Sequence, residues 1–221
     1  MSIPKLRSHI PIAGPARREP IDGTETAMRV SLGFVPRWFS ARCGTDFGKR
    51  WHTDPYYRYK ALNRMKRDLN GAFPDVPYWE RSRTEDLATL SGVYGAYPVP
   101  HAFGIPLIYG PDRWPSLDPT KKLSIEEIER LETDRILGGS VVEDLLRQAE
   151  IIEREWGGVH GYLNWQGVLN NAFNIRGQEI FLDMVERPEL SISFFDLIQA
   201  VPQRSEWRPP PCSVLVTSRE S

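Results

Sequence analysis

The sequence GYLNWQGVLNNAFNIRG, residues 161–177, combines three kinds of local structure in one short run. It begins as an apolar strand, turns through polar and glycine residues, and then starts a helix. Parallel α/β proteins place ligand-contacting groups in such turns, at the carboxyl ends of strands. The pattern therefore predicts a strand over 159–164, a helix over 168–186 and a ligand site between them.

The sequence on either side alternates between strand and helix patterns. Further strands are expected at 29–34, 75–79 and 105–109. Further helices are expected at 55–69, 84–90, 124–131, 140–156 and 189–201. No two expected strands are joined by a tight hairpin turn, and this order is typical of parallel βα units. We therefore expect an α/β fold with about four βα units, in a barrel or a doubly wound sheet.

Local signals mark where several of these helices begin and end. Asp54 followed by Pro55 is a favourable helix start, and Ser124 with Glu127 matches a capping box. Gly157 and Gly158 should end the helix that begins near Ser140. We expect a flexible arm over 1–27, which contains four prolines, one folded unit over 28–201 and an irregular tail over 202–221.

Composition narrows the class of protein. The 221 residues are 40% hydrophobic, which is enough for one domain with a buried core. The 28 basic and 29 acidic residues nearly balance, so nucleic acid and membrane surfaces are not expected partners. No apolar run approaches the roughly 18 residues needed to span a bilayer. The two cysteines, Cys43 and Cys212, lie far apart, which favours a reducing, cytoplasmic location.

Motifs of common catalytic classes are absent from the sequence, including phosphate-binding glycine loops and zinc-protease signatures. The four histidines stand alone, so no metal site is predicted. Residues 37–51 form an aromatic and arginine-rich segment without a clear period, which fits a binding loop or packing over one end of the core. The helix over 55–69 carries a basic side that could contact phosphates or simply face solvent. That side comprises Arg58, Lys60, Arg64, Lys66 and Arg67.

Several short motifs resemble the uroporphyrinogen decarboxylase superfamily. They are RWHTDPYYR at 50–58, YGA at 94–96, FGIP at 103–106, NWQGVLNNA at 164–172 with RG at 176–177, and FLDM at 181–184. The superfamily includes the decarboxylase of haem biosynthesis and methylcobamide-dependent methyltransferases, and the resemblance covers about residues 29–200. It implies a partial (β/α)8 TIM barrel. A complete barrel of this family is longer than this chain, so the resemblance also implies a C-terminally truncated member.

The family's substrate-binding residues are only partly present. The arginine-rich loop of the decarboxylases lies over 38–45, where its two arginines fall on Ala41 and Thr45. The family's essential aspartate falls near Gly95 and its active-site tyrosine falls on Phe173. A macrocycle with eight carboxylates needs fixed cationic donors. The resemblance therefore implies a relative of the decarboxylase and does not identify its substrate.

The predicted pocket joins the central turn to the early loop. Its expected ligand-binding residues are Arg37, Trp38, Arg42, Asn164, Gln166, Asn170 and Arg176, and Asp112 is the catalytic candidate. Helix capping and turn bonding are the alternative for the asparagines, and a turn position is the alternative for Asp112.

Two function classes follow. The first is a barrel enzyme of carboxy-lyase or methyltransferase type that acts on a tetrapyrrole-like or other anionic small molecule. Within this class, a corrinoid-dependent methyltransferase-like protein is the alternative to a decarboxylase-like enzyme. The second class is a non-catalytic truncated remnant or binding module. The sequence requires no cofactor, and corrinoid or zinc would enter only if a further C-terminal half supplied ligands. Uncovered barrel edges would favour a homo-oligomer.

Overall fold

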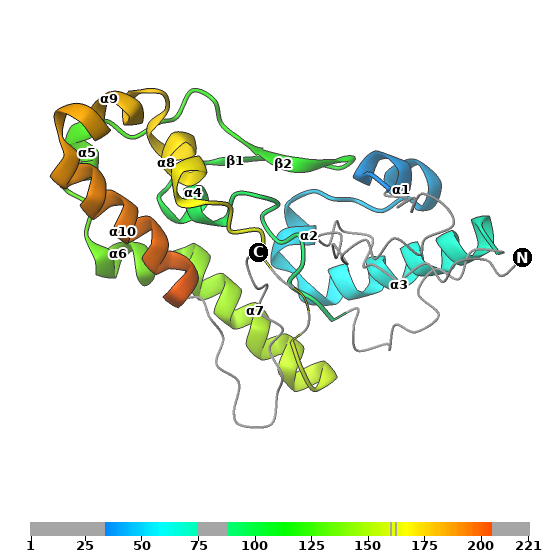
Figure 1. Ribbon diagram of the computed structural model, residues 1–221. Coiled ribbons are helices and arrows are strands. Elements are labelled where there is room, and N and C mark those ends of the chain that lie inside the picture. The colour runs from blue at the N-terminus through cyan, green and yellow to red at the C-terminus, as the bar shows by residue number, and fades with distance from the viewer. Residues whose placement is uncertain (1–33, 75–87, 160, 162, 205–221) are drawn as a thin grey trace, which may run out of the picture.

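The computed structural model describes residues 34–74, 88–159, 161 and 163–204. These residues form ten helices and two strands (Figure 1). In chain order they are α1 (Pro36–Cys43), α2 (Lys49–Thr53), α3 (Pro55–Ala72), α4 (Pro98–Ala102), β1 (Leu107–Gly110), β2 (Arg113–Leu117), α5 (Ile125–Glu129), α6 (Thr133–Leu137), α7 (Ser140–Trp156), α8 (Val168–Arg176), α9 (Glu179–Glu186) and α10 (Pro188–Arg204).

The two strands form an antiparallel hairpin, in which Leu107 pairs with Leu117 and Ile108 with Ser116. The expectation that no strands are joined by a tight turn is therefore wrong at Pro111 and Asp112. The described residues between 159 and 164 are in no strand. The expected strand at 75–79, and nearly all of the one at 29–34, lie outside the described residues. The partial parallel barrel thus stays a prediction.

Residues 37–51 are largely helical, whereas the sequence indicated an irregular loop. Pro36 stands in the first turn of α1, where its missing N–H costs nothing. Gly44 ends α1 with a φ of 64°, a left-handed conformation that glycine adopts at no steric cost. The bulky side chains of this segment pack on α3. Because large apolar residues occur on several sides of these short helices, the sequence shows no clear helical repeat.

Capping signals locate several helix ends correctly. The Asp54 carboxylate accepts a hydrogen bond from the Tyr57 N–H at 3.0 Å and so caps α3. The capping box at Ser124 is present, although α5 ends at Glu129. Helix α7 covers the predicted residues 140–156 and ends at Gly157. The single helix predicted over 168–186 is broken at Gly177 into α8 and α9.

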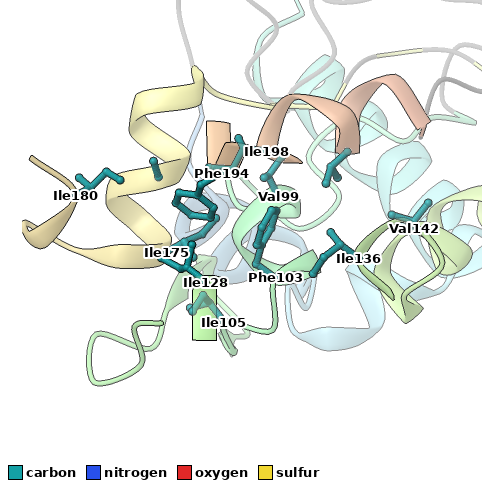
Figure 2. Close-up of a cluster of buried hydrophobic side chains, with 12 residues drawn as sticks. Val99, Phe103, Ile105, Ile128, Ile136, Val142, Ile175, Ile180, Phe194 and Ile198 are labelled. Atoms are coloured by element: carbon teal, nitrogen blue, oxygen red, sulfur yellow. The ribbon is translucent and has the colours of Figure 1, made fainter. Parts of the chain in front are cut away.

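Three clusters of buried apolar side chains hold these elements together. The largest joins α4, α8 and α10, and Figure 2 shows Phe103 and Phe194 facing each other within it. Their rings meet edge to face with centroids 5.8 Å apart. A second cluster packs α1 and α2 on α3, and a third packs α7 on residues 88–94. None of the helices described is long and apolar enough to cross a bilayer.

Candidate functional site

A surface groove of about 560 Å³ lies between α3 and the α1–α2 connection. We call it the α3 groove. Its lining residues are Gly44, Thr45, Arg50, Tyr57, Tyr59, Lys60, Ala61, Asn63, Arg64 and Arg67. A volume of this size is within the range of small-molecule sites in proteins.

One wall of the α3 groove is the turn between α1 and α2. Hydrogen bonds fix this turn to α3: the Tyr57 hydroxyl donates to the Asp46 carbonyl and accepts from the Asp46 N–H, each at 2.9 Å. The Arg64 guanidinium donates to the Cys43 carbonyl at 3.0 Å. Burial raises the pKa of the Cys43 thiol, whose Sγ donates to the Phe39 carbonyl at 3.0 Å. The turn is therefore held in place without a ligand.

The opposite wall is one side of α3. Lys60, Arg64 and Arg67 are spaced four and three residues apart, so they project from the same helix face. Tyr59 is fixed at the rear by stacking on Trp156 of α7, with centroids 4.6 Å apart. The groove thus combines aromatic walls with a row of cations.

Electrostatics favour an anion in this groove. Four lining residues are cationic and none is acidic. Arg50 is partly committed, because it pairs with Asp54 at 3.0 Å and lies 4.8 Å from the centre of the Tyr57 ring. Lys60 and Arg67 have no ion-pair partner in the described part of the chain. Their donors are therefore available to a ligand.

A buried polar network lies behind the groove, on the other side of α3. Arg58 is 1% exposed and donates to the Thr89 carbonyl, the Trp51 carbonyl and the Gln148 side chain at 2.8, 2.8 and 2.9 Å. Gln148 in turn donates to the His52 carbonyl at 2.8 Å. Arg58 was expected on the basic outer side of its helix, and this is wrong. It connects α3 to α2, to α7 and to residue 89.

His52 is a second buried polar residue next to this network. Its ring is fully buried, and its Nδ1 accepts a hydrogen bond from the Tyr94 N–H at 3.0 Å. Burial, with the charge of Arg58, lowers its pKa to about 3. The ring is therefore neutral at physiological pH and serves as an acceptor that holds residue 94, whose φ is 57°.

The predicted residues of the early segment lie mainly outside the groove. Arg37 forms a surface ion pair with Asp112 at 3.1 Å, and the Arg37 side chain is 79% exposed. The catalytic candidate and one binding candidate are thus brought together, at the tip of the hairpin. Trp38 packs against Phe34 in the second cluster, with ring centroids 4.7 Å apart. Arg42 is exposed on α1 and is not among the groove residues.

The residues of the central turn make bonds within the protein. Asn164 accepts from the Gln166 N–H at 3.3 Å, and the Gln166 amide donates to the Ala96 carbonyl at 2.8 Å. Asn170 is exposed, and Arg176 pairs with Asp183 at 2.7 Å. Figure 1 shows α1 and α8 well apart, toward the two ends of the hairpin. The expectation of one shared opening for the two segments is therefore wrong.

In the sequence, the groove cations are recognisable only as part of a basic helix side. Lys60, Arg64 and Arg67 share one phase of the helix, while Arg58 is in phase with Leu62, Met65 and Leu69. Separating the two phases would have identified the wall of the groove. The contribution of Gly44 and Thr45 required the folded turn.

No group of three or more metal-ligating side chains occurs among the residues whose structure is described. Comparisons with protein-family models, with curated proteins and with solved structures found no match.

Proposed function

We propose that this chain binds an anionic small molecule in the α3 groove. The observation that supports the proposal most directly is the row formed by Lys60, Arg64 and Arg67 beside a hollow lined by no acidic residue. A charge-assisted hydrogen bond to such a cation contributes about 1.5–3 kcal/mol. Micromolar affinity corresponds to about 8 kcal/mol, which three such bonds reach only at the upper end of this range, so the ligand must carry anions at matching spacing.

The aromatic walls restrict the ligand further. Tyr57 and Tyr59 line the groove together with the cations, so a flat apolar body with carboxylates at its edge fits the lining chemistry. The resemblance to the uroporphyrinogen decarboxylase superfamily points to the same class, a tetrapyrrole-like polycarboxylate. Membership of that superfamily, a partial barrel fold and a cytoplasmic location are parts of this proposal.

The reaction, if there is one, stays a prediction. Carboxy-lyase and methyltransferase chemistry were both expected from the resemblance, and a non-catalytic binding module is the other candidate. Asp112 does not favour catalysis in the α3 groove, because it lies in the hairpin turn and pairs with Arg37. Binding without turnover would support the binding module.

Reversing the three groove charges should abolish binding. In the K60E/R64E/R67E variant, the affinity for coproporphyrin, a tetracarboxylate, should fall at least about 100-fold, because two or more charge-assisted bonds are lost and repulsion replaces them. All three side chains are exposed, so the fold should persist. Quenching of tryptophan fluorescence during porphyrin titration measures the dissociation constant, and circular dichroism checks the helix content.

The matched control is K121E/R130E/R135E, which makes the same change of net charge at three exposed cations near α5 and α6. It should change the affinity less than threefold. Equal losses in both variants would show that only net charge matters, and an unchanged affinity in K60E/R64E/R67E would refute the proposed site.

A further inference from the structure

Helix α9 exposes four apolar side chains in addition to its two glutamates, Glu179 and Glu186. Its inward side holds Ile180 and Asp183, and Asp183 is buried against Arg176. Its outward side exposes Phe181, Leu182, Met184 and Val185. A helix on the surface of a monomer normally directs its charges to solvent and its apolar residues inward. The outward side of α9 is therefore a candidate surface for contact with another molecule.

The apolar surface of α9 continues onto α8. Phe173 contacts Phe181 with ring centroids 6.1 Å apart, and Leu169 lies one helical turn before Phe173. We call this surface the α8–α9 face: Leu169, Phe173, Phe181, Leu182, Met184 and Val185. Figure 1 shows α9 at the outer edge of the molecule, at the far end from α1. The face is therefore open to a second molecule.

The area of the α8–α9 face suits a dimer interface. Its six side chains are 41% to 81% exposed, which for residues of this size leaves on the order of 600 Å² of apolar surface. The largest apolar patch on a typical monomeric protein measures about 300–600 Å² and is often functional, so this face is at the upper end of that range. A standard stable interface buries about 800 Å² on each partner, with aromatic residues and methionine enriched at its core. The face provides most of that area with that composition.

We propose that two copies of this chain associate through their α8–α9 faces in a twofold symmetric dimer. A twofold interface uses the same patch on both molecules, so one apolar face is sufficient. The proposal is independent of the α3 groove, which lies on other elements, and it is tested without ligand. Because the contact is apolar, association should persist when the salt concentration is raised, whereas anion binding in the groove should weaken.

The test is sedimentation velocity of the 221-residue chain over about 2–200 μM. We expect a monomer–dimer equilibrium with a dissociation constant in the micromolar range. Val185→Glu should weaken it at least about 30-fold, because a charge would be buried at the interface. Val185 is 81% exposed, so the substitution leaves the monomer fold intact. Leu182→Lys, with the opposite charge, should have the same effect.

Ile108→Glu is the matched control, since Ile108 is an exposed apolar residue on β1 and is not part of the α8–α9 face. It should leave the dissociation constant unchanged within about threefold. A chain that is monomeric at every concentration would overturn the proposal. So would a dimer that neither Val185→Glu nor Leu182→Lys weakens, or assemblies larger than the dimer that grow with concentration.

Discussion

Replacing Arg58 with methionine should lower the free energy of unfolding by about 3–5 kcal/mol. The side chain donates three hydrogen bonds in a site that excludes solvent, to the Thr89 and Trp51 carbonyls and to Gln148. Methionine fills a similar volume but leaves those acceptors buried without this donor, and each such acceptor costs about 1–3 kcal/mol. Urea denaturation followed by tryptophan fluorescence measures the change, with the m-value checking that unfolding remains two-state.

Arg64→Met is the matched control, because it makes the same substitution on the outer side of α3. Arg64 is exposed and makes a single bond to the Cys43 carbonyl, so its loss should cost at most about 1 kcal/mol. Arg58→Lys should lie between the two, since one ammonium cannot reach three divergent acceptors. A cost below 1 kcal/mol for Arg58→Met would contradict the role given to the buried network.

The second large effect is a loss of stability in mild acid that depends on His52. The folded protein holds the pKa of this ring at about 3, against an ordinary value of 6.5. Below pH 6.5 His52 is therefore protonated in the unfolded chain but stays neutral in the folded protein. The contribution of the neutral His52 ring to the free energy of unfolding is fully present above pH 6.5. It is lost as the pH falls toward 3, by about 1.4 kcal/mol per pH unit. By pH 4.5 the loss should reach roughly 2–3 kcal/mol.

Other groups also titrate in this range, so the measured quantity is the difference between two proteins. In His52→Asn the amide oxygen can still accept from the Tyr94 N–H, but the side chain does not titrate. Urea denaturation between pH 7 and pH 4.5 should show a steeper loss in the original protein than in the variant. Parallel curves for the two proteins would show that His52 titrates in the folded protein as it does in the unfolded chain, and would contradict this account.

How far the sequence predicts this structure depends on the signal used. Capping residues predicted the helix starts correctly. Asp54 and Ser124 accept hydrogen bonds from free backbone amides of the first helical turn, and these local bonds do not depend on tertiary structure. The break between α8 and α9 could be predicted from Gly177 itself. The helical spacing of apolar residues nevertheless continues through this position. The burial of Arg58 could also be predicted from the sequence, because Arg58 lies on the same helix face as Leu62 and Met65.

Other features depend on tertiary structure. The second strand of the hairpin contains Pro115, which disfavours a strand prediction, yet the strand forms as an edge beside β1. The central turn at Asn164 has the composition of a ligand site, but its side chains bond to neighbouring backbone and to each other. Composition cannot distinguish these two uses, because the same amides serve both.

The most direct test of the proposed binding site is a nitrogen–proton correlation spectrum of the labelled chain during titration with coproporphyrin. Ring currents from the bound macrocycle would shift nearby amides strongly. We predict that the largest changes occur at Gly44, Thr45, Tyr57, Arg64 and Arg67, around the α3 groove. Changes centred instead on Asn164–Arg176, or no saturable change at all, would contradict the assignment of the α3 groove as an anion site.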